Sequence, residues 1–189
     1  MNSNSKFVFG IDEVGRGCVA GPLVVCACLD SKSLLDYEIL NDSKKITPKK
    51  REVLASQLIK NETFFIAVCP SKTIDSIKMA ASLKLTFWNL ASNVRMKFKD
   101  AFLLIDGNLD FGIQNCETVI KGDTKHKSIM AASVIAKVYR DKMMSNEASR
   151  FSNFDFRSHK GYLTKKHIQE IKESKITYLH RESFLSNYL

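Results

Sequence analysis

The sequence predicts an α/β protein in which helices flank a mixed β-sheet, with a small helical extension at the C-terminal end. Short runs of β-branched and aromatic residues alternate with longer segments whose apolar residues recur at helical spacing. The chain has 189 residues and 44% of them are hydrophobic, which is enough for one sizeable core. The sequence contains no repeat and no low-complexity block. We therefore expect a core over residues 1–150 and an extension over 151–189 that packs on it.

The first half of the chain begins with two strands. Residues 7–12 and 23–29 are rich in apolar and β-branched side chains, and a glycine-rich segment joins them. A helix is expected to follow, with Thr47 as its N-cap and Pro48 at its first position. Residues 63–69 predict a third strand, which ends at a proline.

The second half continues this alternation. Residues 73–98 carry apolar side chains at helical spacing, and we expect this helix to break near Leu83. Two further strands are expected at 101–105 and 118–120. The helix expected over 127–144 is apolar on nearly every side, which indicates that it is buried against the sheet.

The charge of the chain indicates an anionic partner. The sequence has 29 Lys and Arg residues against 20 Asp and Glu residues, a formal net charge of +9, and its pI is about 9.3. Nucleic acid is the partner that such a charge first suggests. A lysine-rich surface that is only solvated has the same composition, so the charge alone leaves both interpretations open.

The cysteines predict a reduced protein. Their number is odd and they show no Cys-x-x-Cys spacing, so we expect free, mostly buried thiols rather than disulfides or a metal site. They are Cys18, Cys26, Cys28, Cys69 and Cys116. The sequence also shows no signal peptide and no apolar run of transmembrane length, so we expect a soluble, cytoplasmic protein.

Carboxylates follow three of the predicted strands. Asp12 and Glu13 end the first strand, Asp106 follows the fourth, and Asp123 comes shortly after the fifth. Ligands of open α/β sheets bind beyond strand ends, so neighbouring strands would bring the four acids together. Acids that close repel one another unless a divalent cation lies among them, and an all-oxygen set favours Mg²⁺ or Mn²⁺. Two such ions are the usual apparatus for phosphodiester hydrolysis.

Each of these acids also has a purely structural explanation. Asp106 precedes a glycine and could form a turn, and Asp123 could cap the helix that follows it. Asp12 and Glu13 are adjacent, and adjacent strand residues point to opposite faces of a sheet. The two could therefore share one ion only if the strand twists or ends there.

The segment Gly15-Arg16-Gly17 follows the first acids and is suited to an anionic ligand. Glycines allow the main chain to approach a ligand closely, and the Arg16 guanidinium is a fork of donors that matches phosphate. A hairpin turn without any ligand would also explain the two glycines.

Motifs along nearly the whole chain match one family. In chain order they are residues 10–17 (GIDEVGRG), 20–22 (AGP), 42–45 (DSKK), 105–107 (IDG), 121–123 (KGD), 131–138 (AASVIAKV) with Arg140 and Asp141, 160–162 (KGY) with Thr164 and His167, and His180, Arg181 and Phe184. With these motifs in this order, the chain resembles the type 2 ribonucleases H, the ribonuclease HII family.

The resemblance implies a ribonuclease H-like fold and an endonuclease. Such an enzyme hydrolyses the RNA strand of RNA–DNA hybrids and incises 5′ of single ribonucleotides embedded in duplex DNA, leaving 5′-phosphate and 3′-hydroxyl ends. It would use Mg²⁺ or Mn²⁺ and act as a monomer. By position, the resemblance makes the catalytic, metal-binding acids Asp12, Glu13, Asp106 and Asp123.

The same resemblance assigns substrate contacts. Gly15, Arg16 and Gly17 would sense the ribose 2′-hydroxyl, mostly through backbone groups, and Tyr162 would stack on the sugar of the next deoxynucleotide. Apart from the resemblance, Lys44 and Lys121 are candidates for contact with backbone phosphates. Lys44 belongs to a basic run that a solvated helix start would explain equally well. Two alternatives remain open: a nucleic-acid-binding module without catalysis, and a related-fold nuclease that cuts DNA junctions.

Other residues carry simpler expectations. Trp88 lies within a predicted helix and is expected in the core rather than on a base-stacking surface. Ser133 is expected to hydrogen-bond its own helix, and Asp141, which follows Arg140, is expected to form a local ion pair. A short helix is expected over 164–173. The four histidines show no metal-ligand spacing, so we expect structural or surface roles for His126, His159, His167 and His180.

Overall fold

The computed structural model describes residues 6–42, 46–186 and 188 of the chain. In chain order the elements are β1 (Val8–Val14), β2 (Leu23–Leu29), the 3-10 helices η1 (Lys32–Asp36) and η2 (Glu38–Asp42), α1 (Pro48–Asn61), β3 (Phe64–Cys69), α2 (Ser71–Lys97), β4 (Phe102–Asp106), β5 (Cys116–Val119), η3 (Gly122–Thr124), α3 (Lys127–Glu147), α4 (Phe156–His159), α5 (Lys165–Glu173) and η4 (Glu182–Phe184).

A five-stranded mixed sheet forms the centre of the fold. The strand order is β3-β2-β1-β4-β5. β1 pairs with β2 in antiparallel and with β4 in parallel orientation, and β4 and β5 are also parallel. The carboxyl ends of β1, β4 and β5 therefore point the same way. The predicted mixed α/β architecture is confirmed.

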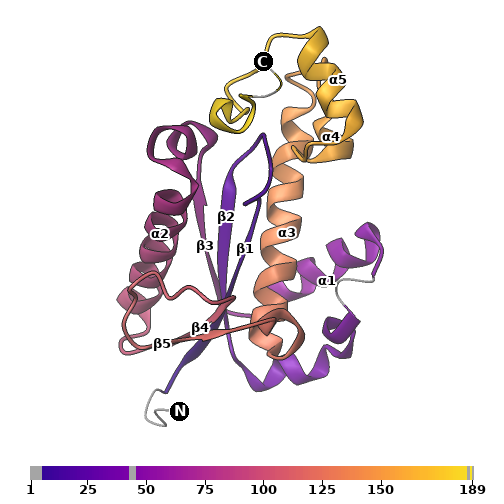
Figure 1. Cartoon of the computed structure of the whole chain (residues 1–189). Coiled ribbons are helices and arrows are strands. Elements are labelled where there is room, and N and C mark those ends of the chain that lie inside the picture. Colours follow the sequence, from indigo (N-terminus) through magenta and orange to yellow (C-terminus); the bar gives the residue numbers. More distant parts are fainter. Residues whose placement is uncertain (1–5, 43–45, 187, 189) are drawn as a thin grey trace.

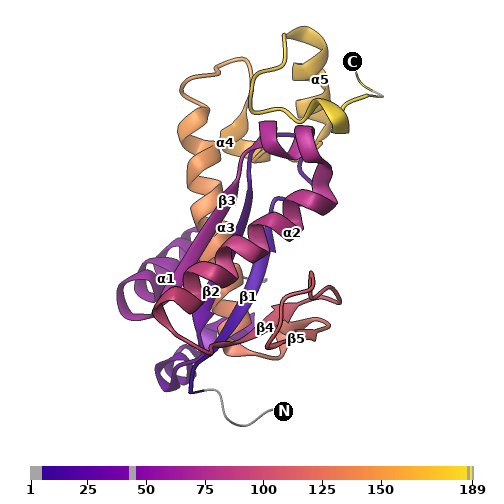
Figure 2. The same cartoon turned by 90° about the vertical axis from the view of Figure 1, so that its left-hand side faces the viewer.

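Helices cover both faces of this sheet. In Figure 1, α2 lies on one side of the strands, and α3 with α1 lies on the other. Figure 2 shows α2 crossing the sheet on the side facing the viewer. The alternation of side chains in β2 accounts for this layering, because Leu23 and Val25 pack in the α2 layer whereas Val24 and Cys26 pack in the layer of α1 and α3. The molecule is therefore a three-layer structure with the sheet buried on both faces.

The first helix begins where the sequence predicts it. The Thr47 side chain accepts a hydrogen bond from the Lys50 N–H at 3.4 Å, and Pro48 occupies the first helical position. α2 does break, but at Lys78 rather than near Leu83. Lys78 has a φ of 66° and interrupts the helical backbone. Periodicity cannot locate such a break, because the apolar stripe continues on both sides of it.

The contact between α3 and β1 depends on a glycine. A Cβ on Gly10 would overlap the backbone nitrogen of Ile129, so only glycine lets the start of α3 approach the strand this closely. α3 is largely buried, as its sequence predicts. This close packing brings the polar residues of α3 within reach of Asp12, two residues after Gly10 on the same face of the strand.

The C-terminal segment packs at one end of α3, at the top of Figure 1. α5 begins after Thr164, whose side chain accepts a hydrogen bond from the His167 N–H at 3.2 Å. An apolar cluster joins this segment to the rest of the chain. Its buried members are Val19, Ala20, Met144, Phe154, Phe156, Ile171, Leu179 and Leu185.

The cysteines agree with the expectation of free, mostly buried thiols. All five cysteines are free thiols, and four of them are buried while Cys116 is partly exposed. Within the described residues, no helix combines the length and apolar character that crossing a lipid bilayer requires.

Candidate active site

Three acids from separate elements meet beside the carboxyl ends of the parallel strands. Asp12 lies in β1, Asp106 ends β4, and Asp123 lies in η3. Each offers a carboxylate oxygen, and the three oxygens all lie within 4.8 Å of one another. An all-oxygen set at this spacing fits a hard divalent cation such as Mg²⁺ or Mn²⁺. We call these three residues the acidic trio.

Asp12 is the most buried member of the trio, with 8% of its surface exposed. Its Oδ1 accepts a hydrogen bond from the Glu13 N–H at 2.7 Å, and its carboxylate is also hydrogen-bonded by the Ser133 side chain of α3. Burial, the largest cause, acts together with the negative charges of Glu13 and Asp106 to raise the pKa of Asp12 to about 7, although both hydrogen bonds lower it. The sequence predicted that Ser133 would hydrogen-bond only within its own helix. In the structure its side chain contacts Asp12 instead.

Asp106 links β4 to the turn that carries Asp123. Its Oδ1 accepts hydrogen bonds from the backbone N–H of Gly122 at 2.6 Å and of Asp123 at 3.4 Å. This turn is tight, because Lys121 has a φ of 57° and a Cβ on Gly122 would lie 2.5 Å from the Ile129 side chain. The Asp106 carboxylate therefore stabilises this turn and is at the same time a member of the acidic trio. Asp123 does not cap α3, since His126 occupies the N-cap position.

Glu13 lies outside the trio. β1 continues to Val14, so Glu13 points to the sheet face opposite Asp12. Its Oε1 lies 3.9 Å from Nη1 of Arg16. Burial raises the pKa of Glu13, Arg16 lowers it and Asp106 raises it, so Glu13 still lies within the electrostatic range of the trio. Of the four acids expected together, the structure brings three into one cluster and places the fourth beside it.

The glycine turn lies directly after Glu13. Gly15 has a φ of 96°, and a Cβ there would lie 2.5 Å from Nε of Arg140 and 2.6 Å from the Pro22 carbonyl oxygen. A Cβ on Gly17 would meet nothing within 4 Å. Gly15 is therefore required by packing within the protein, whereas Gly17 leaves an open surface that a ligand can approach.

Two buried arginines stabilise this turn and the residues after it through hydrogen bonds to backbone carbonyls. Arg140 of α3 donates hydrogen bonds to the carbonyl oxygens of Pro22 at 2.9 Å, Ala20 at 2.8 Å and Lys160 at 2.8 Å. Arg181 donates to the carbonyl of Gly21 at 2.7 Å and to that of Arg16 at 3.2 Å. Both guanidiniums are completely buried. The expected local ion pair of Asp141 is confirmed, and its partner is Lys137 at 2.8 Å.

Tyr162 lies beside the same turn. Its ring is 40% exposed, its hydroxyl is hydrogen-bonded with Cys18, and the Lys137 ammonium lies 5.4 Å from its ring centroid. The guanidinium carbon of Arg140 lies 5.9 Å from the same centroid. Arg140 therefore contacts both the glycine turn and Tyr162, a connection that no sequence pattern indicated.

The remaining predicted substrate contacts have different outcomes. Arg16 is mostly exposed and Lys121 is exposed at the start of η3. Lys44 lies outside the described residues.

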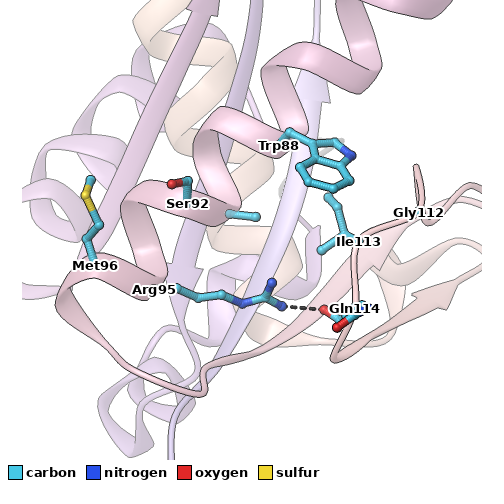
Figure 3. A pocket seen from close by; sticks show the side chains of 8 residues that line it. Trp88, Ser92, Arg95, Met96, Gly112, Ile113 and Gln114 are labelled. Atoms are coloured by element: carbon cyan, nitrogen blue, oxygen red, sulfur yellow. Dashed lines mark hydrogen bonds between the residues drawn. The ribbon is translucent and has the colours of Figure 1, made fainter.

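A separate pocket lies away from these residues. It has a volume of about 550 Å³ and lies between α2 and the segment that leads into β5 (Figure 3). Its lining includes Trp88, Met96 and Ile113, and none of the acids. Trp88 is 50% exposed and its Nε1 donates a hydrogen bond to the Phe111 carbonyl at 2.9 Å. The expectation that Trp88 lies in the core is therefore wrong.

Comparison with known proteins gives consistent results. The sequence model of the family described as Ribonuclease HII matches residues 9–187. Ribonuclease HII of Clostridium beijerinckii is 41% identical over 191 residues, which cover 97% of this chain and 69% of that protein. Ribonuclease HII of Mycoplasma mycoides subsp. mycoides is 39% identical, with 96% of this chain and 87% of that protein covered.

Solved structures agree with these relatives. The crystal structure of ribonuclease H2 from Pyrococcus horikoshii OT3 has a TM-score of 0.80 at 25% identity, covering 96% of this chain and 98% of that one. Ribonuclease HII of Archaeoglobus fulgidus, solved in a complex with PCNA, has a TM-score of 0.78 at 26% identity, covering 93% of each chain. By its sequence and its fold, the chain belongs to the ribonuclease HII family.

Proposed function

We propose that the acidic trio, completed by Glu13, is the catalytic centre at which this protein hydrolyses phosphodiester bonds of ribonucleotides. As a member of the ribonuclease HII family, the chain is an endoribonuclease that acts on the RNA strand of RNA–DNA hybrids and depends on a divalent cation. The proposal assigns that established activity to Asp12, Glu13, Asp106 and Asp123.

The observation that carries this assignment is the clustering of one buried and two partly buried acids. Three carboxylate oxygens lie within 4.8 Å, and the pKa of Asp12 is raised to about 7 because its charge is buried beside other acids. Folding alone gives no reason to bury carboxylates together, whereas a divalent cation offsets their repulsion. Mg²⁺ or Mn²⁺ bound there supplies a water of lowered pKa and positive charge opposite the phosphate.

The residues of the chain orient the reaction around these acids. Ser133 and the Glu13 N–H hold the Asp12 carboxylate, and the Gly122 N–H holds that of Asp106. Fixed hydrogen bonds of this kind keep the acids in one geometry when substrate binds. The attacking water loses a proton as its oxygen bonds phosphorus, and the bond between phosphorus and the 3′-oxygen breaks. The leaving 3′-oxygen takes up a proton, which gives a 3′-hydroxyl and a 5′-phosphate.

Substrate selection is proposed to lie in the glycine turn and Tyr162. The open surface at Gly17 allows backbone groups to reach a ribose 2′-hydroxyl, the group that distinguishes RNA from DNA. The half-exposed Tyr162 ring next to the turn is suited to stack on the following sugar. This pair would let the enzyme incise 5′ of a single ribonucleotide embedded in DNA.

Binding of the duplex is proposed to rest on positive charge. Arg16 and Lys121 lie next to the acids in sequence and would contact backbone phosphates, and the net charge of +9 would attract the duplex over a longer range. Lys44 is proposed for the same role from its sequence position. We further propose that the enzyme acts in the cytoplasm and as a monomer.

One assay tests this function. The substrate is a DNA duplex with a single embedded ribonucleotide, incubated with Mg²⁺, with Mn²⁺ or with chelator, beside its all-deoxy counterpart. We expect incision 5′ of the ribonucleotide with either cation, no incision with chelator, and none of the all-deoxy duplex. The Asp106→Asn variant is expected to be inactive yet folded, because the amide oxygen still accepts from Gly122.

The alternatives give different results in the same assay. Binding of the duplex with no product in any cation would support a non-catalytic module. Cleavage of the all-deoxy duplex would support a nuclease that acts on DNA. Full activity of Asp106→Asn would contradict the assignment of the catalytic centre.

A further inference from the structure

Three buried histidines form a stack outside the acidic trio. They are His159 in α4, His167 in α5, and His180 shortly before η4. The rings of His159 and His167 lie parallel with centroids 3.9 Å apart, and those of His167 and His180 lie 5.2 Å apart. All three are buried. The sequence predicted structural roles for them but did not indicate that they meet.

The hydrogen bonds of His159 fix the position of its proton. The Gly161 N–H donates to Nδ1 of His159 at 3.1 Å, so Nδ1 carries a lone pair. The proton of a neutral ring is then on Nε2, which lies 3.0 Å from a carboxylate oxygen of Glu170 and donates to it. His159 therefore ties Gly161 to α5.

His180 and His167 form a directed chain of hydrogen bonds. The Thr177 N–H donates to Nδ1 of His180 at 3.0 Å, which places the proton of His180 on Nε2. Nε2 of His180 lies 3.1 Å from Nε2 of His167. A hydrogen bond between two nitrogens needs one proton, which Nε2 of His180 donates, so Nε2 of His167 is the acceptor. The proton of His167 is consequently on Nδ1, which donates to the Tyr162 carbonyl at 2.9 Å.

Both branches end on the segment that carries the proposed substrate-stacking residue. His159 accepts from Gly161 and His167 donates to Tyr162. The Gly161 carbonyl in turn accepts from the backbone N–H groups of Val19 and Ala20 at 2.9 and 3.2 Å, at the end of the glycine turn. The histidines thus fix the backbone of Tyr162 relative to the turn that faces the substrate.

We propose that His167 and His180 are positioning residues that set the place of Tyr162 through a directed chain of neutral rings, Thr177 to His180 to His167 to Tyr162. The proposal deepens the proposed function and rests on it, because it takes Tyr162 to be a substrate contact. Neither histidine touches substrate. Their effect is transmitted through the Tyr162 carbonyl.

The surroundings keep these rings neutral. Burial lowers the pKa of both His167 and His180 to about 4, and each ring also lowers the pKa of the next. Glu170 raises the pKa of His159 and His167 but does not outweigh burial, and Asp155 and Lys166 act on His159 in opposite directions. The chain of hydrogen bonds is therefore complete at neutral pH.

A matched pair of variants tests the direction of the chain. His167→Asn keeps an amide N–H near the place of Nδ1 and so keeps the bond to Tyr162, but loses the acceptor for His180. His167→Gln keeps a group near Nε2 for His180 but loses the donor to Tyr162. His167→Asn leaves the buried Nε2–H of His180 without its acceptor, whereas in His167→Gln the Tyr162 carbonyl still accepts from the Thr164 N–H at 2.9 Å. The melting temperature should therefore fall more in His167→Asn than in His167→Gln.

The two variants should differ in substrate selection. On the duplex with one embedded ribonucleotide, we expect His167→Gln to lose about tenfold in kcat/KM, and His167→Asn to stay within about threefold of wild type. On a long RNA–DNA hybrid, kcat/KM of both variants should fall by less than it does on the duplex with one ribonucleotide. Equal losses for the two variants on both substrates would mean that His167 acts only through packing, and would overturn the proposal.

A second measurement needs no variant. Nitrogen NMR of histidine-labelled wild-type protein at pH 7 should show His159 and His180 protonated on Nε2 and His167 protonated on Nδ1. His167 and His180, whose pKa values are lowered to about 4, should stay neutral to below pH 5. A His167 protonated on Nε2, or charged at pH 7, would overturn the proposal even if both variants failed to fold.

The Tyr162→Ala variant distinguishes a failure of the positioning role of the histidines from a failure of the substrate role of Tyr162. If Tyr162→Ala keeps the wild-type preference for single ribonucleotides, the substrate role of Tyr162 fails, and the positioning role of the histidines fails with it. If Tyr162→Ala loses that preference while the two His167 variants behave alike, only the positioning proposal fails.

Discussion

Asp12 is an acid that the fold makes costly to ionise. It is buried between β1 and α3, and its pKa is raised to about 7, first by burial and then by the charges of neighbouring acids. The sequence predicted that this residue would meet Asp106 and Asp123 because all three follow strands. It could not predict that Glu13 would face away, since this depends on β1 continuing to Val14.

We expect Asp12→Asn to be inactive but more stable than wild type in the absence of metal at pH 8. The amide oxygen still accepts from the Glu13 N–H, while the buried charge and its ligand oxygen are removed. Activity is measured on a duplex with one ribonucleotide, and stability by urea unfolding in chelator. Addition of Mg²⁺ should stabilise the wild type and not the variant.

The pH dependence of this gain follows from the direction of the pKa shift. Because the pKa of Asp12 is about 7 in the folded protein and 3.8 for an ordinary aspartate, folded Asp12 holds a proton between these pH values that the unfolded chain has released. Its stabilising contribution is complete below pH 3.8 and is lost as pH rises through about 7. The advantage of Asp12→Asn should therefore grow by about 1.4 kcal/mol per pH unit between pH 5 and 7. A constant advantage would contradict the assigned cause.

Tyr162 gives a second prediction for a single residue. We expect Tyr162→Ala to reduce cleavage at a single embedded ribonucleotide more than cleavage of a long hybrid, measured as kcat/KM on both. An embedded ribonucleotide offers one productive register, whereas a long hybrid offers a ribose at every position. Tyr162→Phe is the control, because it keeps the ring and loses only the hydroxyl bonded with Cys18. Equal losses on the two substrates would argue against stacking.

Among the elements, α3 joins the acidic trio to the glycine turn. It carries Ser133 against Asp12 and, two turns later, Arg140 beneath the glycine turn. The sequence predicted a buried helix here from its apolar periodicity. It gave no sign that Arg140 is completely buried, because three carbonyls from segments far apart in the chain satisfy its charge.

Replacement of Arg140 tests this link. We expect Arg140→Met to lower the free energy of unfolding by about 2–4 kcal/mol, since three buried carbonyls lose a charged donor. Cleavage at a single ribonucleotide should fall as well, because the glycine turn and Tyr162 are no longer tied together. Urea unfolding and the cleavage assay are the measurements.

The matched control lies on the same helix. Lys142→Met removes the same charge from an exposed position of α3, and should change stability by less than about 0.5 kcal/mol. Similar losses in the two variants would mean that net charge, rather than the contacts of Arg140, supports the turn.

α2 shows where element-level prediction fails. The start of α2 was predicted to within two residues. The position of its break and the exposure of Trp88 were not predicted. Trp88 packs against the segment before β5 through its bond to the Phe111 carbonyl, not against the sheet. Helical periodicity reports that a face is apolar, and it cannot say whether a sheet or a loop covers that face.

For the whole molecule, the sequence predicted the sheet, its covering helices and the place where the acids meet. Each rests on a rule that acts along the chain, such as strand alternation or the position of acids at strand ends. The buried arginines rest on contacts with residues 16–22, which are far from them in the sequence. The three histidines meet because the C-terminal segment folds back on itself. No local pattern encodes such contacts, so they could not be predicted without the fold.

The expected boundary at residue 150 separates the core of residues 1–150 from the C-terminal extension, and contacts across it involve the whole molecule. We propose that residues 151–189 are an extension that completes the core of residues 1–150 and the substrate surface. Val19 and Ala20, near the start of the chain, share an apolar cluster with Phe154 and Phe156. Arg181 also reaches back to the carbonyls of Gly21 and Arg16.

This arrangement predicts that a chain ending at residue 150 does not fold cooperatively by itself. The truncation would expose the apolar surface of Val19, Ala20 and Met144, and would remove Lys160 and Arg181 from the contacts that hold the glycine turn. Urea unfolding followed by circular dichroism should show a broad transition, and the peptide 151–189 added in trans should sharpen it. A steep transition of the truncated chain, unchanged by the peptide, would mean that the first 150 residues are an independent domain.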